Sequence, residues 1–166
     1  MTVGAAPYDV TVAFLDQAPH YVDALVAWER SNWPIAVMGE SEPTAYLREA
    51  ARNQGSPYPK TVVALHKNNK PIGMTSIIEQ DHPDFPRYGP WLVSLYVEPA
   101  FRHRGVSRIL VSKAVDYARS IRNIDNLYVY SDELDFTKNG FAFFAQAQNP
   151  YSPQHKTNLY VLNLDG

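Results

Sequence analysis

The chain has 166 residues, of which 45% are hydrophobic and 19% charged, and its formal net charge is −2. This length suits one domain that buries roughly 70% of its unfolded surface, and the composition excludes a largely disordered chain. The slight acidic balance creates no field that would gather polyanions, so we expect no nucleic-acid partner. Because no cysteine is present, disulfides, thiolate metal sites and a cysteine nucleophile are excluded, and a cytoplasmic location is expected.

Targeting and linker signals are missing from the sequence. Residues 1–8 carry neither a basic flank nor a long apolar run, and nowhere do eighteen apolar residues follow one another. We therefore expect no signal peptide and no membrane partner. No repeat, low-complexity tract or linker divides the chain, so we expect a single domain over residues 1–166.

The first elements are predicted from the spacing of apolar residues and from the positions of proline and glycine. Residues 10–14 are apolar and β-branched and predict a strand, whereas apolar residues at helical spacing predict a helix over 18–31. Proline is tolerated in the first turn of a helix, so Pro43 marks the start of a second helix, which continues until Gly55.

A hairpin and a buried strand follow. Two β-rich runs, 61–66 and 71–78, are separated by the polar residues 67–70, whose asparagines tolerate positive φ. Residues 81–90 hold three prolines and no periodicity, which indicates an irregular loop. The strand over 91–97 is apolar at nearly every position and is expected to be covered on both faces.

The last third of the chain contains the clearest helix, over residues 105–121, with one apolar side. Strands are predicted over 127–130, 141–145 and 158–164. The order predicts an α/β domain with a mixed, mostly antiparallel central sheet of about six to seven strands, flanked by about four helices. An exposed terminal strand would permit a homodimer.

One junction between strand and helix predicts a binding site for an anion. After the strand that ends at Val97, a tight turn leads into the helix that begins near Gly105. Such a turn directs unsatisfied backbone N–H groups outward where the helix dipole also favours negative charge, which suits a pyrophosphate. Gly105 lets the backbone approach a phosphate, and Arg102, Arg104 and Arg108 add positive charge. Simple solvation is the alternative reading of these arginines.

This junction resembles a known family, the GNAT N-acetyltransferases, whose signature is R/Q-x-x-G-x-G/A after a strand ending in V-x-P. The matching residues are Val97-Glu98-Pro99, then Arg102-His103-Arg104-Gly105-Val106-Ser107, then Lys138-Asn139-Gly140-Phe141 after a further strand. The resemblance is sharpest over residues 91–141. It departs at Ser107, where the family has glycine or alanine.

The resemblance implies that acetyl-CoA is the cosubstrate, that no metal is needed, and that the acceptor is the amine of a small molecule or peptide, which attacks the thioester directly. Main-chain groups of the strand would pair with the pantetheine arm, and the turn would hold the pyrophosphate. The residues implied to bind the cofactor are Leu95, Tyr96, Val97, Arg102, His103, Arg104, Gly105, Val106, Ser107 and Arg108.

Direct attack requires a neutral amine, and a lysine-like amine with a pKa of about 10.4 is neutral at pH 7 in only about one molecule in 2,500. A general base or a proton-conducting water chain is therefore expected. Four residues near the end of the strand over 71–78 are candidates, and Glu79 is our preferred base; the others are Asp81, His82 and Asp84.

The family often has a tyrosine four residues before the glycine of its G-F pair, where it protonates the departing thiolate. This sequence has Phe136 there, so we assign the acid to Tyr130, with Tyr96 as the alternative. Acceptor selection is expected to fall to the 18–56 helices and the 81–90 loop. The aromatic and acidic residues there are Trp28, Glu29, Trp33, Tyr46, Tyr58, Phe85 and Tyr88.

Other functions remain to be weighed. Phe136 and the lack of a decisive base are consistent with a non-catalytic or weakly active acyl-CoA sensor. A nucleic-acid binder that uses the arginines of 102–122 is disfavoured by the acidic balance. The five histidines are scattered without metal-ligand spacing, and G-x-S-x-G does not occur, which argues against a metal centre and a serine hydrolase.

Overall fold

The computed structural model describes residues 9–33, 44–53, 55–150 and 152–165. Seven strands and three α-helices lie within these ranges. The strands are β1 (Thr11–Phe14), β2 (Lys60–His66), β3 (Lys70–Ile78), β4 (Trp91–Val97), β5 (Asn126–Ser131), β6 (Ala142–Asn149) and β7 (Ser152–Asn163), and the helices are α1 (Val22–Asn32), α2 (Ala45–Arg52) and α3 (Val106–Arg119).

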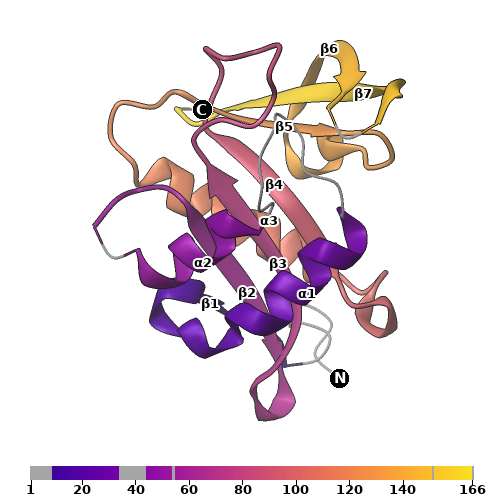
Figure 1. Cartoon of the computed structure of the whole chain (residues 1–166). Helices are drawn as coiled ribbons and strands as arrows, with labels where there is room; N and C mark the ends of the chain where they lie inside the picture. Colours follow the sequence, from indigo (N-terminus) through magenta and orange to yellow (C-terminus); the bar gives the residue numbers. More distant parts are fainter. Residues whose placement is uncertain (1–8, 34–43, 54, 151, 166) are drawn as a thin grey trace.

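The strands form one sheet in the order β1-β2-β3-β4-β5-β7-β6 (Figure 1). β4 and β5 pair in parallel, and the other neighbouring pairs are antiparallel. The predicted α/β fold with a mixed, mostly antiparallel sheet is confirmed. The predicted hairpin is also present, and Asn68 and Asn69 have positive φ at its turn.

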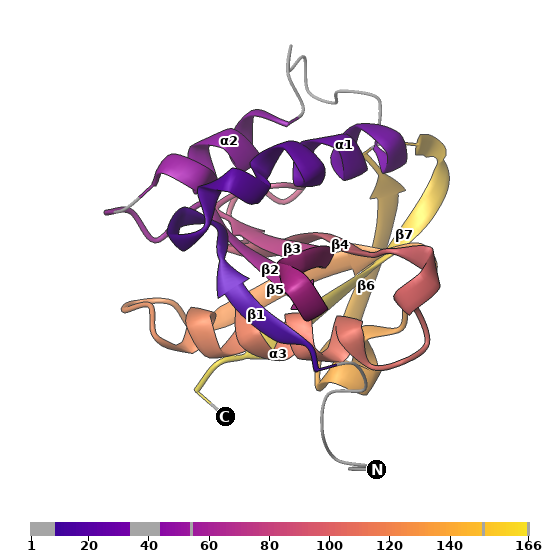
Figure 2. The same ribbon diagram turned by 90° about the horizontal axis from the view of Figure 1, so that it is seen from below.

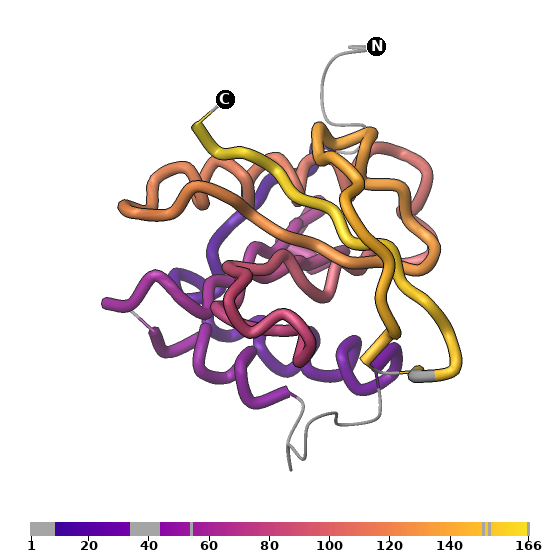
Figure 3. The backbone as a smooth tube through the Cα atoms, turned by 90° about the horizontal axis from the view of Figure 1, so that it is seen from above, coloured from indigo at the N-terminus to yellow at the C-terminus, as the bar shows by residue number. Residues whose placement is uncertain are grey.

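Helices cover both faces of the sheet. Figure 2 shows α1 and α2 on one face and α3 on the other, and Figure 3 shows the same layers from the opposite side. The sheet separates two hydrophobic cores, and β2 contributes to both, because successive side chains of a strand point to opposite faces of the sheet. Val62 and Ala64 pack in the cluster with α3, whereas Val63 and Leu65 pack in the cluster with α1 and α2.

The number of helices roughly matches the prediction of about four: three α-helices lie within the described ranges, and the segment before β6 forms the 3₁₀ turn η5 (Phe136–Asn139), which Gly140 ends at φ 89°. Two details differ from the sequence predictions. β7, the last strand of the chain, lies inside the sheet, and the two edge strands are β6 and the first strand, β1. β4 is buried at both ends, but its middle residues 93–96 are partly exposed, because they line an open cleft.

Two predictions concern residues outside the described ranges: the helix start at Pro43 and the N-terminal segment 1–8. Within the described part of the chain, no helix combines the length and apolar character needed to cross a bilayer.

Candidate active site

The sheet opens between its two parallel strands. β4 and β5 share a single register pair, Trp91 with Tyr128, next to a hydrogen bond from Tyr128 N to Pro90 O of 3.0 Å. Beyond that point the strands are no longer paired with each other. The backbone groups on the facing sides of β4 and β5 are therefore available to a ligand.

A β-bulge turns the middle of β4. Met74 pairs with Tyr96 and Ser76 pairs with Val93, so two residues of β4 face a single residue of β3. Ser94, one of these two, has a φ of 56°, which is uncommon for a residue other than glycine. Bulges bend a strand and redirect its side chains, and this bulge lies on the wall of the opening.

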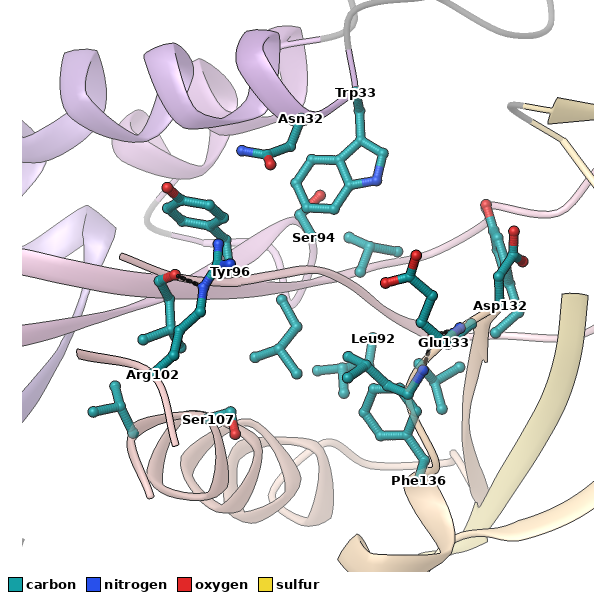
Figure 4. A pocket seen from close by; sticks show the side chains of 18 of the residues that line it. Asn32, Trp33, Leu92, Ser94, Tyr96, Arg102, Ser107, Asp132, Glu133 and Phe136 are labelled. Atoms are coloured by element: carbon teal, nitrogen blue, oxygen red, sulfur yellow. Dashed lines mark hydrogen bonds between the residues drawn. The ribbon is translucent and has the colours of Figure 1, made fainter. Parts of the chain in front are cut away.

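The opening is a cleft of about 860 Å³. Residues 92–97 of β4 form one wall, and β5 with the segment that follows it forms the other. The end of α1 and the start of α3 line the cleft as well. Figure 4 shows that Trp33 approaches from the α1 side, and Ser107 and Phe136 from the α3 side.

The turn before α3 has the geometry of an anion seat. His103 and Gly105 have φ angles of 63° and 88°, whereas Arg102 between the strand and the turn has a φ of −74°. Changes of handedness along a turn direct backbone N–H groups into a concavity that suits an anion. Gly105 is the N-cap of α3, and no side chain of the described residues caps the helix there. The helix N-terminus can thus donate to a ligand.

Arg102 holds the turn against β4. Its Nε donates to Val97 O over 2.7 Å, and its guanidinium lies 5.5 Å from the ring centre of Tyr96. The Tyr96 hydroxyl in turn donates to Glu98 Oε2 over 3.1 Å, and Trp28 Nε1 donates to Glu98 Oε1 over 3.2 Å. Glu98 is therefore a structural carboxylate, as its position beside a phosphate seat predicts.

Glu29 is a buried acid of the cleft with a raised pKa. It lies on α1 with 4% of its surface exposed, and burial raises its pKa from 4.5 to about 7. Hydrogen bonds from Tyr46 and Ser94 oppose that rise, and the charge of Asp81 adds to it. A carboxyl group with a pKa near neutrality can accept a proton at physiological pH.

Glu29 is connected to the bulge by hydroxyl groups. The Tyr46 hydroxyl donates to Glu29 Oε1 over 2.8 Å and makes a short hydrogen bond with Ser94 Oγ. Side chains from α1, α2 and β4 thus form one hydrogen-bonded group on the wall of the cleft. A proton released at the bulge has a path to a buried carboxylate.

The predicted site residues can now be located. Arg104 and Arg108 are exposed and are not among the lining residues; Arg108 lies on a second groove, along α3. The residues predicted to bind the cofactor that line the cleft are Leu95, Tyr96, Val97, Arg102, His103, Gly105, Val106 and Ser107.

Of the two residues predicted to be catalytic, Tyr130 lines the cleft and Glu79 does not. Tyr130 lines the cleft, and its ring packs edge-on against His82 at 5.2 Å. Glu79 is exposed at the end of β3 and is not among the lining residues, whereas Asp81, two residues later, is buried and lines the cleft. Sequence reasoning assigned Glu29 to acceptor selection and did not consider it as the base.

Phe136 lies where the family often has its tyrosine. It is 3% exposed, lines the cleft and packs edge-on against Phe141 at 5.8 Å and Tyr160 at 5.9 Å. These contacts hold the phenyl ring in the wall of the cleft. Phe136 therefore acts as an apolar wall.

Solved structures share this fold over nearly the whole chain. Arabidopsis thaliana NAA60 in complex with acetyl-CoA matches with a TM-score of 0.71 and 16% identity, covering 95% of this chain and 99% of that one. The Salmonella typhimurium protein yncA with its cofactor acetyl-CoA matches with a TM-score of 0.69 and 20% identity, covering 95% of both chains. An aminoglycoside 6'-N-acetyltransferase complexed with coenzyme A matches with a TM-score of 0.67 and 18% identity, covering 93% and 97%.

The fold is therefore that of the GNAT-type transferases. The model of the acetyltransferase (GNAT) family matches residues 22–141, which is more than half of the chain. This chain belongs to the GNAT family of acetyltransferases, and the predicted resemblance is confirmed. A comparison with curated protein sequences found no match.

Proposed function

We propose that this protein transfers the acetyl group of acetyl-CoA to a primary amine of a small molecule or peptide. The observation that carries the proposal is the cleft between β4 and β5, which runs from the uncapped N-terminus of α3 to a buried carboxylate with a pKa of about 7. One end suits a diphosphate, and the other suits the deprotonation of an amine.

The α3 end of the cleft is the proposed seat of coenzyme A. The amides of residues 103–107 would donate to the pyrophosphate, and Arg102 would keep the turn in place through Val97 O. The pantetheine arm would lie along β4 beside Leu95 and Tyr96, where β5 has diverged. Backbone pairing of this kind resembles the addition of a strand to a sheet.

At the other end, the acceptor amine would attack the carbonyl carbon of the thioester. The new bond joins nitrogen to carbon, the carbon–sulfur bond breaks, and the sulfur leaves as a thiolate. Glu29 would take the proton that the amine loses, directly or through Ser94 and Tyr46. Removing the proton from a lysine-like ammonium at pH 7 costs about 4.6 kcal/mol in water. A base aligned with the amine can offset much of this free-energy cost.

The leaving thiolate needs a proton, and Tyr130 is the proposed donor because it lines the cleft. Tyr96 suits this role less, since its hydroxyl already donates to Glu98 and its pKa is raised by burial and then by Glu98. A thiol with a pKa of about 8.5 is a good leaving group, so the absence of a tyrosine at Phe136 is compatible with turnover.

A weakly active acyl-CoA-binding protein is the second candidate, and the apolar Phe136 is the observation that favours it. Both candidates predict binding of coenzyme A, but only the enzyme predicts steady turnover with one class of amine. The test is a free-thiol assay with acetyl-CoA and a panel of polyamines, aminoglycosides, amino acids and peptide N-termini, run beside a thermal-shift titration with coenzyme A.

Steady thiol release that depends on one class of amine would support the transferase. A thermal shift without turnover on any amine would support the binding protein instead. No thermal shift and no turnover would overturn both.

A further inference from the structure

The far end of the cleft, away from the α3 turn, is acidic. Its carboxylates come from α1, from the loop after β3 and from the segment after β5. They are Glu29, Asp81, Asp132 and Glu133. The basic side chains among the described lining residues are Arg102 and His103, and both belong to the turn before α3.

Two of these acids lie beyond the end of β5, where hydrogen bonds hold the carboxylate of Asp132 and the backbone of Glu133. Asn149 Nδ2, from the end of β6, donates to Asp132 Oδ2 over 2.8 Å. Ser131 Oγ accepts from Glu133 N over 3.3 Å and from Leu134 N over 2.9 Å, which fixes the turn that carries both acids. In Figure 4 the Glu133 side chain projects into the space below Trp33. The two acids therefore form a wall of the cleft.

Trp33 adds an aromatic surface to this wall. It follows α1 directly, is partly exposed and lines the cleft from the side opposite Phe136 (Figure 4). An indole face attracts cations, most strongly among the aromatic side chains. Carboxylates opposite an indole favour an ammonium group and disfavour a carboxylate.

Two acidic positions thus lie along one cleft, and they have different environments. Glu29 is buried and connected to the bulge in β4, where the thioester would lie under the proposed function. Asp132 and Glu133 are exposed at the rim and remain solvated. A buried acid suits the exchange of a proton, whereas solvated acids suit a permanent partner for a cation.

We propose that the acceptor carries at least two ammonium groups, one that reacts beside Glu29 and a second that Asp132 and Glu133 bind. The inference rests on the proposed function and specifies its substrate class. In the reaction, the first ammonium loses two protons in total: Glu29 takes one before attack, and the other passes to solvent as the amide forms. Tyr130 protonates the thiolate and regains a proton from solvent, and the second ammonium keeps its charge. Amino acids are excluded as preferred acceptors, because their carboxylate would face the acidic wall.

Three acceptors with the same five-methylene chain test this directly: 1,5-diaminopentane, 1-aminohexane and 6-aminohexanoate. They differ only in the group at the far end, which is an ammonium, a methyl or a carboxylate. We expect kcat/KM to be about tenfold higher for the diamine than for the monoamine, and lower again for the amino acid. Raising the salt concentration should narrow these ratios. Spermidine and an aminoglycoside then distinguish a flexible polyamine from a cyclic polycation.

The paired variant Asp132→Asn with Glu133→Gln should reduce the ratio of diamine to monoamine to within about twofold, while the KM for acetyl-CoA stays the same. Glu49→Gln is the matched control. It removes an exposed carboxylate on α2 that is not among the lining residues, and it should keep the full ratio.

Equal kcat/KM for diamine and monoamine, or a ratio that survives in the paired variant, would overturn the inference. In either case acetyl transfer itself would persist, so the proposed function would stand. Loss of the thermal shift with coenzyme A and of all turnover would instead remove the proposed function, and the inference with it.

Discussion

Glu29 lies on the face of α1 that packs in the hydrophobic core, and it is also the proposed general base. It lies four residues after Leu25 and three after Val26, both buried, so helical spacing puts its carboxyl group on the core face. That spacing is visible in the sequence and could have identified it. What the spacing does not reveal is that Tyr46 and Ser94, from two other elements, give the buried carboxyl its partners.

The raised pKa of Glu29 makes a prediction for stability. A folded-state pKa of about 7, above the unfolded value of 4.5, means that the folded protein holds the proton more tightly. The group therefore costs stability as the pH rises from about 4.5 to about 7. In Glu29→Gln this cost is absent, so the free energy of unfolding of the variant, minus that of the wild type, should rise over this window by at most about 3 kcal/mol.

Urea unfolding at pH 5, 6, 7 and 8 measures this difference. Glu49→Gln, at an exposed position on α2, serves as the control and should give a flat difference. A flat difference for Glu29→Gln as well would mean that the carboxyl titrates normally in the folded protein.

The same carboxyl group predicts the pH dependence of catalysis. In the wild type, kcat/KM should rise with pH and bend near pH 7 as Glu29 loses its proton. Glu29→Gln should lower kcat/KM by about 10²–10⁴-fold and remove the bend, leaving a steady rise as the acceptor amine itself deprotonates. If the variant keeps both the rate and the bend, the base is another group, and Asp81 is the next to test.

At the scale of elements, the segment from β4 to α3 was the most predictable part of the chain. A buried strand, a turn with Gly105 and an amphipathic helix follow from apolar runs and helical spacing alone. The bulge at Ser94 was not predictable, because it depends on which residues of β3 pair with β4. Glu79 was preferred to Asp81 as the general base, but Asp81 is the one that lines the cleft. This too depends on contacts between distant parts of the chain.

The loop after β3 decides which of those two acids turns inward. His82 Nε2 contacts Gln148 O at 3.0 Å, a residue 66 positions away in the sequence, and this contact fixes the loop against β6. Asp81, next to His82, is buried as a result, while Glu79 remains exposed. Long-range contacts of this kind leave no local pattern in the sequence.

The turn before α3 supports a prediction with an internal control. Gly105 has a φ of 88°, so any other residue there is strained by about 1–2 kcal/mol, which both Gly105→Ala and Gly105→Glu should show as a loss of stability. Gly105→Glu adds a carboxylate where the diphosphate is proposed to bind. Coenzyme A at about 100 times its Kd should raise the melting temperature of the wild type by about 5–10 °C.

A thermal-shift titration of the three proteins separates strain from charge. Gly105→Ala should start from a lower melting temperature and still respond to coenzyme A, whereas Gly105→Glu should not respond. Equal responses from the two variants would place the diphosphate somewhere other than this turn.

For the molecule as a whole, the cleft is where two parts of the sheet meet. β1 to β4 lie on one side and β5, β7 and β6 on the other, and a single register pair joins β4 to β5. α3 packs against β2, β3 and β4, and its core cluster also contains Leu127 and Val129 of β5. The facing backbone groups of β4 and β5 do not pair with each other beyond this register pair. A ligand that lies between the two strands would give these groups hydrogen-bond partners.

Hydrogen exchange can detect this bridging. Within residues 94–97 of β4 and 129–131 of β5, the amides that face the opening should exchange slowly only when coenzyme A or acetyl-CoA is bound, because these groups lack a pairing strand in the free protein. The amides of the same residues that point toward β3 or β7 are paired in the free protein and should change less. Amides in the middle of β2 are paired on both sides, with β1 and β3, and should change little under conditions where exchange is local. A uniform slowing over all strands would indicate a general gain in stability, and protection confined to β6 would locate the ligand outside the cleft.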